Sequence, residues 1–255
     1  MWAEDDLTQD AFLGGRVRAW QPRKGYRAGT DPVFLAAACT ARPGDTVLEL
    51  GCGAGVASLC LAARVPDLAI TGVERQAGYA DLARRNGLNV AEADLITLPA
   101  DLRQRSFDHV IANPPYYPAG GGTKAGDAGR EAALREDTAL TDWVEIAGRR
   151  LAPKGWLTVI QAAERLPDLM AALSAAGFGA ISLLPLASRT GRAAGRVLIK
   201  ARKSGRAPFT LMAPFIMHDG SDHQSDGEDY TAPARAILRD GAALDWPGTG
   251  EMPTN

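Results

Sequence analysis

The middle of the sequence alternates short β-rich runs with stretches of helical periodicity, and this alternation restricts the possible folds more than any other feature. Strands are predicted at residues 46–51, 68–74, 88–93 and 107–112. Helices are predicted after the first two of these strands, at residues 54–64 and 77–86. A strand, a helix and a second strand in succession form a βαβ unit whose strands are parallel. The chain is therefore predicted to have an α/β fold with a mainly parallel sheet.

The second half of the chain continues this alternation and then departs from it once. A helical pattern at 137–151 is followed by a strand at 155–160 and a helix at 165–176. The last two predicted strands, at 180–186 and 197–201, are joined by a basic connection that leaves no room for a helix. Neighbouring strands joined without a crossover helix run antiparallel. We therefore expect seven strands, with a C-terminal antiparallel hairpin.

Length, cysteine content and hydropathy limit the class of protein. The chain has 255 residues, enough for one large α/β domain, and its three cysteines, Cys39, Cys52 and Cys60, have the spacing of no zinc module. Such cysteines indicate reduced thiols in a cytosolic protein, without a structural metal. The N-terminus lacks the basic and apolar regions of a signal peptide, and no stretch approaches the roughly 18 apolar residues of a membrane span. A soluble, cytoplasmic protein is expected.

Three regions are expected along the chain. Residues 1–14 are acidic and expected to be mobile, residues 15–206 form the main domain, and residues 207–255 form a C-terminal appendage. The appendage contains an apolar, strand-like segment at 211–217, then an acidic loop, and a short helix at 232–239 that packs back on the body. None of these features indicates an oligomeric state.

Charge is segregated along the chain, although the net charge is only −2. Residues 15–30 and residues 188–206 each contain several arginines and lysines and no acid. We expect both segments to face a polyanion, because neutralised phosphates supply most non-specific affinity for nucleic acid. A solvated surface is the alternative. The basic residues predicted to contact such a substrate are Arg23, Lys24, Arg27, Arg189, Arg192, Arg196 and Lys200.

An Asn-Pro-Pro-Tyr motif, residues 113–116, follows directly after the predicted strand at 107–112. Two consecutive prolines fix two φ angles and remove two backbone donors, so the motif is rigid. The Asn113 amide oxygen and the Pro114 carbonyl can accept hydrogen bonds from an amine while the ring of Tyr116 stacks on a planar group. Asn113, Pro114 and Tyr116 are therefore the predicted catalytic residues. A plain proline turn at the end of a strand is the alternative.

Three features near this motif have alternative interpretations. Tyr117 is either a second stacking face or a core residue. The glycine-rich segment 119–129, which contains Lys124, is either a lid ordered by substrate or a surface loop. His109, at an interior strand position, is expected to be a core histidine rather than a catalyst.

A glycine turn follows the first predicted strand and opens the first helix. Gly51, Gly53 and Gly55 come shortly after Glu49 with the spacing G-x-G-x-G. Missing side chains and free backbone N–H groups let a ligand approach such a turn closely. A dinucleotide fingerprint, G-x-G-x-x-G, is not met because this chain has Val56 or Ser58 where the third glycine would stand. Neither a nicotinamide nor a flavin cofactor is therefore expected.

The glycine turn, the Asn-Pro-Pro-Tyr motif and the strand pattern together resemble the class I S-adenosylmethionine-dependent methyltransferases over residues 25–203. This resemblance implies a Rossmann-like sheet and S-adenosylmethionine as cofactor, with the glycine turn against its methionyl part. It also implies that Glu74 holds the ribose hydroxyls and that Asp94 lies beside the adenine. Both acids end predicted strands, where open α/β sheets bind ligands. Capping of the turns that follow is the alternative.

The segment 25–31 resembles the part of amino-methyltransferases that closes over the methionyl end of the cofactor. Thr30 or Asp31 is otherwise an ordinary N-cap before Pro32. The residues that the resemblance assigns to cofactor binding are Tyr26, Thr30, Glu49, Gly51, Gly53, Gly55, Glu74, Asp94 and Asn113.

The Asn-Pro-Pro-Tyr motif is shared by enzymes that methylate adenine N6 in DNA or RNA, guanine N2 in ribosomal RNA, and the glutamine amide of release factors. Residues 21–31, 48–55 and 113–117 taken together are similar to the bacterial tRNA1(Val) adenine-N6-methyltransferase group. This resemblance implies in-line methyl transfer to an exocyclic amine of tRNA, without a covalent enzyme intermediate. Guanine N2 of ribosomal RNA, a protein glutamine N5 and a non-catalytic S-adenosylmethionine-binding scaffold are the alternatives.

Overall fold

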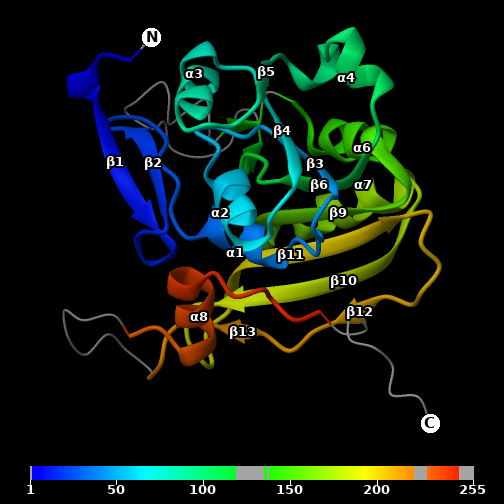
Figure 1. Cartoon of the computed structure of the whole chain (residues 1–255). Coiled ribbons are helices and arrows are strands. Elements are labelled where there is room, and N and C mark those ends of the chain that lie inside the picture. Colours follow the sequence, from blue (N-terminus) through cyan, green and yellow to red (C-terminus); the bar gives the residue numbers. More distant parts are fainter. Residues whose placement is uncertain (1, 119–134, 137, 221–228, 247–255) are drawn as a thin grey trace.

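The computed structural model describes residues 2–118, 135–136, 138–220 and 229–246. A nine-stranded sheet lies at the centre, in the order β12-β10-β11-β9-β6-β3-β4-β5, with β13 paired to β10 (Figure 1). Strands β3, β4, β5, β6 and β9 are parallel, whereas β11 runs antiparallel between β9 and β10. The seven main strands are β3 (Thr46–Leu50), β4 (Ala69–Glu74), β5 (Val90–Glu92), β6 (Phe107–Ala112), β9 (Leu151–Ala162), β10 (Phe178–Ala187) and β11 (Ala194–Lys203). The predicted α/β fold with a C-terminal antiparallel hairpin is confirmed.

Helices cover both faces of this sheet (Figure 1). Because successive residues of a strand point to opposite faces, Val47 and Ile111 belong to one buried cluster with α1 and α2, while Leu48 and Val110 belong to another with α6 and α7. The helices are α1 (Asp31–Ala38), α2 (Val56–Arg64), α3 (Ala77–Arg85), α4 (Ala100–Gln104), α6 (Leu140–Arg150) and α7 (Leu166–Ala175). Within the described ranges, no helix has the length and apolar character needed to cross a membrane.

Several short elements complete the described chain. Two-residue strands β7 (Tyr117–Pro118) and β8 (Arg135–Glu136) pair in parallel. Single 3-10 turns occur at η1 (Glu4–Asp6), η2 (Leu13–Gly15), η3 (Leu95–Thr97) and η4 (Ala163–Arg165). The side chain of Tyr117 and all of the segment 119–129 lie outside the described residues, so both interpretations given for each of them stay predictions.

The N-terminus forms a β-hairpin, so the expected mobility of residues 1–14 is wrong for most of that segment. Strand β1 (Leu7–Phe12) pairs antiparallel with β2 (Val17–Pro22) along its whole length. Three of the four acids that suggested mobility lie in η1 and the fourth, Asp10, lies in β1 itself. Leu7 is only 3% exposed and packs with Tyr79 of α3. Long-range packing of one apolar residue outweighs the local acidic composition here.

The C-terminal appendage extends the sheet and then covers one face of the molecule. Strands β12 (Thr210–Leu211) and β13 (Phe215–Ile216) both pair in parallel with β10. Helix α8 (Ala232–Asp240) occupies the position where a helix was predicted at 232–239, and it packs in the cluster that includes α1. Beyond it, the Trp246 Nε1 donates to the Ala38 carbonyl at 2.8 Å. Residues 221–228 of the predicted acidic loop lie outside the described part of the chain.

Lys200 is buried in the body, so its predicted contact with a polyanion is wrong. Its side chain on β11 is 3% exposed, and its Nζ lies 4.4 Å from the ring centroid of Trp156 and 5.5 Å from that of Trp246. Burial disfavours the charged ammonium and lowers the pKa of Lys200 from 10.5 to about 8. The C-terminal appendage covers this lysine through Trp246. The basic residues around Lys200 in the sequence do not indicate this burial.

We predict that Lys200 makes the stability of the fold rise with pH. Because its folded pKa is about 8 and its ordinary pKa is 10.5, the unfolded chain holds more protons between these values, and the free energy of unfolding increases across that window. Lys200→Met should remove this increase, which is on the order of 3 kcal/mol at ~1.4 kcal/mol per pKa unit. Urea unfolding at pH 7.5 and 10 measures it, with exposed Lys154→Met as the control. Equal pH dependence in wild type and Lys200→Met would contradict the prediction.

Candidate active site

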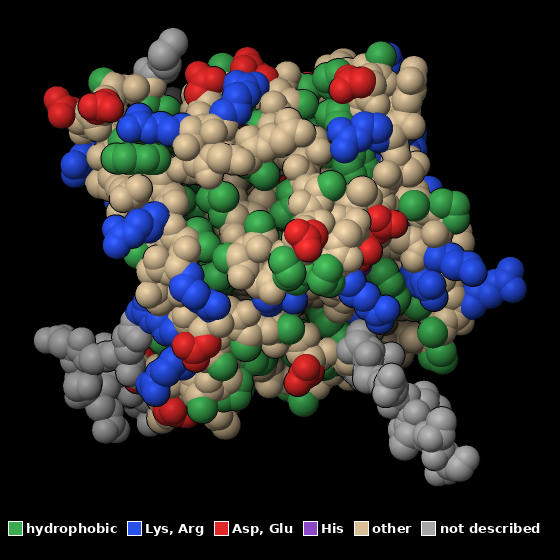
Figure 2. All heavy atoms as spheres, in the orientation of Figure 1, with side chains coloured by type: hydrophobic (Ala, Val, Ile, Leu, Met, Phe, Trp, Pro, Cys, Tyr) green, Lys and Arg blue, Asp and Glu red, His purple; other side chains and the backbone are tan. Residues whose placement is uncertain are grey.

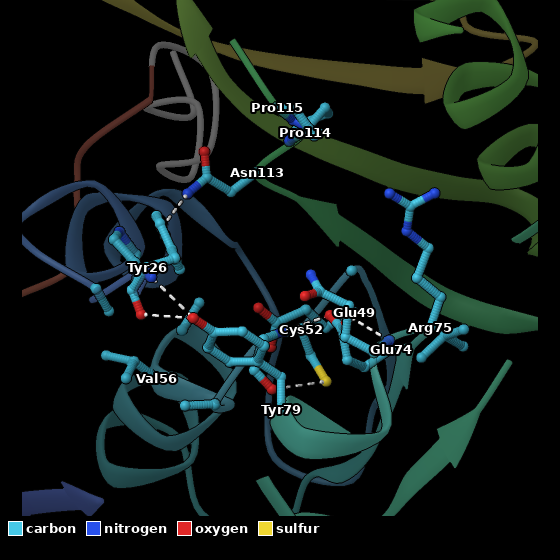
Figure 3. Close-up of a pocket in the computed structure, with 18 of the residues that line it drawn as sticks. Tyr26, Glu49, Cys52, Val56, Glu74, Arg75, Tyr79, Asn113, Pro114 and Pro115 are labelled. Carbon is cyan, nitrogen blue, oxygen red and sulfur yellow. Dashed lines mark hydrogen bonds between the residues drawn. The ribbon is translucent and has the colours of Figure 1, made fainter. Parts of the chain in front are cut away.

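A cavity opens at the edge of the sheet where the parallel strands end (Figure 3). Its wall is formed by residues that follow β3, β4, β5 and β6, together with the segment after β2. Both sequence motifs contribute to it, since Gly51 and Gly53 line the cavity together with Asn113 and Tyr116. One cavity therefore joins the glycine turn to the Asn-Pro-Pro-Tyr motif.

The glycine turn holds three left-handed residues, with φ of +63° at Gly51, +54° at Gly53 and +84° at Gly55. A Cβ on Gly51 would lie 2.5 Å from the Trp143 Cη2 of α6, so this glycine permits helix packing. A Cβ on Gly53 would meet no protein atom within 4 Å. Because Gly53 lines the cavity, its missing side chain leaves space for a ligand beside the backbone.

Glu74 presents a carboxylate beside this turn, at the end of β4. Its Oε2 accepts a hydrogen bond from the Gly53 N–H at 3.0 Å, and its Oε1 accepts one from the Gln76 N–H at 2.9 Å. The side chain is buried, which raises its pKa above the usual range. Each oxygen keeps a further lone pair. The carboxylate can therefore accept two hydroxyl donors from a ligand, such as those of a ribose.

Glu49 also lines the cavity, but its side chain joins β3 to the first turn of α2. Its Oε2 accepts hydrogen bonds from the Ser58 hydroxyl and from the Ser58 N–H, the latter at 3.1 Å. Burial raises the pKa of Glu49 to about 7. The sequence analysis did not identify Ser58 as a partner of Glu49, because a serine in a helix carries no separate signal.

Three of the predicted cofactor contacts, Thr30, Gly55 and Asp94, are not among the residues that line the cavity. Gly55 lies against Leu88 and Ala83 instead. The Asp94 Oδ1 accepts from the Ile96 N–H at 2.9 Å, which makes Asp94 the N-cap of η3. Thr30 is the N-cap residue of α1, without a side-chain hydrogen bond to the helix. Only at Asp94 does the structure have the capping hydrogen bond that was the alternative. Ala93 and Leu95, on either side of Asp94, line the cavity.

Tyr26 lines the cavity and is held there by Tyr79, which the sequence analysis missed. The Tyr79 hydroxyl accepts from the Tyr26 N–H at 2.8 Å and donates to the Tyr26 carbonyl at 3.1 Å (Figure 3). The Tyr26 hydroxyl in turn accepts from the Asn113 Nδ2 at 3.4 Å. Tyr79 lies on the buried face of α3, where its spacing indicates only a core residue.

Gln21 is a second supporting residue that the sequence analysis did not identify. Its Nε2 donates to the Asp10 Oδ2 at 2.6 Å, and its Oε1 accepts from the Ala28 N–H at 2.7 Å. Gln21 is buried and lines the cavity. The N-terminal hairpin is therefore part of the cavity wall.

The Asn-Pro-Pro-Tyr motif forms a hydrogen-bonded group at the end of β6. The Asn113 Oδ1 lies 2.9 Å from the Tyr116 hydroxyl, within hydrogen-bond distance. The Gln161 Nε2 of β9 lies 3.4 Å from the Pro114 carbonyl oxygen and 3.3 Å from that of Pro115. Gln161 is fully buried and was also missed, because its position opposite the prolines follows from strand pairing. Each carbonyl oxygen keeps a second lone pair for another donor.

The ring of Tyr116 is covered on one face. The Arg196 guanidinium carbon lies 4.2 Å from its ring centroid, and the Tyr116 hydroxyl donates to the Asp31 Oδ2. The Arg196 Nε donates to the same oxygen at 3.0 Å. Arg196 was predicted to contact the nucleic-acid backbone, but its head group is directed at the motif. A planar group can therefore stack on Tyr116 only at the opposite face.

Other members of the predicted basic set also form hydrogen bonds and ion pairs with residues of the protein itself. Arg189 pairs with Asp229 and donates to the Asp219 carbonyl. Arg27 donates to both oxygens of Asp10, at 2.8 and 2.7 Å. Lysines and arginines are spread over the face in Figure 2 among acidic and apolar side chains, without one continuous basic field. The exposed members of the predicted set are Arg23, Lys24, Arg27 and Arg192.

Comparison with known families and proteins gives consistent matches. The profile of the family described as "Methyltransferase small domain" matches residues 28–181. A Shewanella baltica protein named tRNA1(Val) (adenine(37)-N6)-methyltransferase is 33% identical over 230 residues, which cover 85% of this chain and 92% of that protein. A Dickeya chrysanthemi protein of the same name is 29% identical over 86% of this chain and 88% of its own length.

Solved structures have the same fold. A predicted O-methyltransferase from Agrobacterium tumefaciens has a TM-score of 0.67 and 26% sequence identity, over 84% of this chain and 98% of that chain. The T. thermophilus 16S rRNA N2 G1207 methyltransferase, solved with AdoMet and guanosine, has a TM-score of 0.54 and 20% identity, over 79% of this chain and 46% of its own. The second likeness concerns the fold alone. The methyltransferase family whose profile matches uses S-adenosylmethionine as its cofactor.

We predict that two glycines of one turn respond differently to the same substitution. Gly53→Ala places a methyl group in the open space of the cavity and should weaken S-adenosylmethionine binding at least tenfold, measured by calorimetry. Gly51→Ala forces a clash with Trp143 and should lower the melting temperature by several degrees instead. Both positions have positive φ, so backbone strain is matched between the variants. Equal losses of affinity in both variants would show that Gly53 has no particular contact with the cofactor.

Proposed function

The chain belongs to the methyltransferase small-domain family of S-adenosylmethionine-dependent enzymes, and from this premise we propose that it methylates the N6 amine of an adenine in a tRNA. The observation that carries the proposal is the single cavity shared by the glycine turn and the Asn-Pro-Pro-Tyr motif. The substrate class is supported by relatives at about 30% identity that are named tRNA1(Val) (adenine(37)-N6)-methyltransferases.

The cofactor site in this proposal uses the residues beside β3 and β4. Gly53 leaves room for the methionyl part, and the Glu74 carboxylate accepts hydrogen bonds from the ribose hydroxyls. Tyr26, held by Tyr79, closes the cavity from the segment after β2. When bound, S-adenosylmethionine supplies a methyl group on a positively charged sulfur, which an amine lone pair can attack directly.

Asn113 and Pro114 orient the acceptor amine. The Asn113 Oδ1 and the Pro114 carbonyl oxygen each accept a hydrogen bond from one of its two N–H groups, which directs the nitrogen lone pair away from them and into the cavity. An exocyclic amine conjugated to a purine is a weak nucleophile, so this orientation and the polar surroundings supply most of the catalysis. The nitrogen would take the methyl group from the cofactor sulfur, which would leave as a neutral thioether, and would release one proton to water. Burial keeps Tyr26 and Tyr116 protonated by raising the pKa of each.

An amine fits the site better than a hydroxyl, although one relative in structure is described as a predicted O-methyltransferase. A hydroxyl acceptor has one proton and generally requires a base to remove it. The cavity carboxylates Glu49 and Glu74 are already hydrogen-bonded to backbone N–H groups and, at Glu49, to a serine. Two carbonyl acceptors at the motif match two amine protons.

A direct test supplies labelled S-adenosylmethionine to the protein with unmodified tRNA, ribosomal RNA and a protein extract, followed by nucleoside and amino-acid mass spectrometry. The proposal expects N6-methyladenosine in the tRNA fraction. N2-methylguanosine in ribosomal RNA or methylglutamine in protein would replace the proposed substrate while keeping the amine chemistry. Label on an oxygen, or no transfer to any fraction, would overturn the reaction itself.

We predict that Asn113→Ala lowers turnover by about a hundredfold or more, as expected when a preorganised polar contact is removed. Cofactor affinity and melting temperature should change little, because within the described ranges the hydrogen-bonding partners of this side chain are Tyr26 and Tyr116. Initial rates at saturating cofactor measure the effect. Asn89→Ala makes the same change at an exposed position outside the cavity lining. Unchanged turnover in Asn113→Ala would remove the residue from the mechanism.

We predict that exposed basic residues near the cavity contribute to RNA affinity. Lys24 follows β2 next to the cavity segment, and Arg192 lies in the β10–β11 turn at the same edge of the sheet. Lys24→Glu and Arg192→Glu should each weaken binding and reduce the slope of log K against log salt by about one. Lys154→Glu, at the opposite end of β9, is the control. Filter binding at several salt concentrations measures the slopes, and identical slopes would assign both residues to ordinary surface.

A further inference from the structure

The hydroxyl of Tyr116 lies between two acceptors. It is hydrogen-bonded to the Asp31 Oδ2 on one side, and it lies 2.9 Å from the Asn113 Oδ1 on the other. A phenol has one hydrogen, so it can donate to only one of these oxygens at a time. The direction of this hydrogen therefore decides whether a lone pair of the Asn113 amide oxygen is occupied by the protein.

Asp31 is fixed relative to this hydroxyl by a second residue from a distant part of the chain. It is the first residue of α1, and its Oδ2 also accepts from the Arg196 Nε of β11 at 3.0 Å. The Arg196 guanidinium lies over the Tyr116 ring. The ion pair is partly buried, with 25% of the Asp31 side chain and 38% of the Arg196 side chain exposed. Three segments thus meet at one carboxylate oxygen.

We infer that Asp31, held by Arg196, is a positioning residue that draws the Tyr116 hydrogen away from Asn113 and leaves the amide oxygen open to the substrate amine. This inference rests on the proposed function, because it concerns the acceptor that orients the amine. A charged carboxylate is a stronger acceptor than an amide oxygen. Without that charge the hydrogen is shared with Asn113, and the substrate amine has to displace it.

The same arrangement limits how the base enters. Because Arg196 covers one face of the Tyr116 ring, the target base stacks on the other face. Arg196 therefore has two effects: it orients Asp31 and it leaves one stacking surface available. Neither effect requires Arg196 to contact the nucleic acid.

A double-mutant cycle tests the inference. Asp31→Asn should lower kcat about tenfold, since it exchanges a charged acceptor for a neutral one, with little change in cofactor affinity. Tyr116→Phe keeps the ring and removes the hydrogen, so its kcat is the reference for the other arm of the cycle. In that background, Asp31→Asn should cause no further loss of kcat. Losses that multiply would overturn the inference, because a structural role of Asp31 at the start of α1 does not depend on the Tyr116 hydroxyl.

Matched variants separate positioning from stability. Asp81→Asn breaks an exposed Asp–Arg pair on α3, with Arg84, and should leave kcat unchanged. Arg196→Lys keeps the charge but loses the planar guanidinium, so it should lower kcat in the same direction as Asp31→Asn, and this loss should shrink in the Tyr116→Phe background. Arg196→Lys replaces Asp31→Asn in the test if Asp31→Asn unfolds below the assay temperature. An Arg196→Lys loss that persists unchanged in Tyr116→Phe would count against the inference.

A readout independent of methyl transfer distinguishes failure of this inference from failure of the proposed function. In protein labelled with carbon-13 at the tyrosine Cζ, the Tyr116 resonance is identified by its loss in Tyr116→Phe. Asp31→Asn should shift that resonance, and Asp81→Asn should not. If the wild type methylates no RNA, the proposed function fails while this shift still reports the hydrogen bond. An unshifted Tyr116 resonance in Asp31→Asn would overturn the inference whatever the substrate.

Discussion

The parallel pairing of β3 with β6 determines where everything else in the site can lie. Leu50 at the end of β3 is paired with Ala112 at the end of β6, so Gly51 and Asn113 leave the sheet side by side. Parallel strands end at the same edge, and the loops after them form a crevice there. Two motifs separated by some sixty residues of chain therefore line one cavity.

The polar groups around this cavity are largely bonded to one another before any ligand is present. The Glu74 carboxylate accepts hydrogen bonds from the N–H groups of Gly53 and Gln76. The Tyr79 hydroxyl is hydrogen-bonded to the N–H and the carbonyl of Tyr26. The Asn113 side chain lies within hydrogen-bond distance of the Tyr26 and Tyr116 hydroxyls. Buried polar groups without partners would destabilise the fold. The same bonds fix the atoms that a ligand meets, so little reorganisation accompanies binding.

Much of the fold and part of the site could be predicted from local patterns. The main strands lie close to their predicted ranges, and the hairpin of β10 and β11 follows from the absence of a helix between them. His109 is buried with its Nε2 3.2 Å from the Asp45 Oδ2, in agreement with its interpretation as a core histidine. Tyr79 and Gln161 could not be predicted as site residues, because each acts on a segment far away in sequence.

The sequence by itself determined the order of the main strands and helices, the glycine turn and the rigid proline motif, because these depend on periodicity and on the backbone properties of glycine and proline. Only the tertiary structure decided which charges face solvent. Lys200 and Arg196 belong to one basic run, yet one is buried between tryptophans and the other stacks on Tyr116. The N-terminal hairpin likewise depends on α3 for its packing. The environment of each of these side chains is formed by residues distant in sequence. Local composition therefore cannot predict whether such a side chain is buried or exposed.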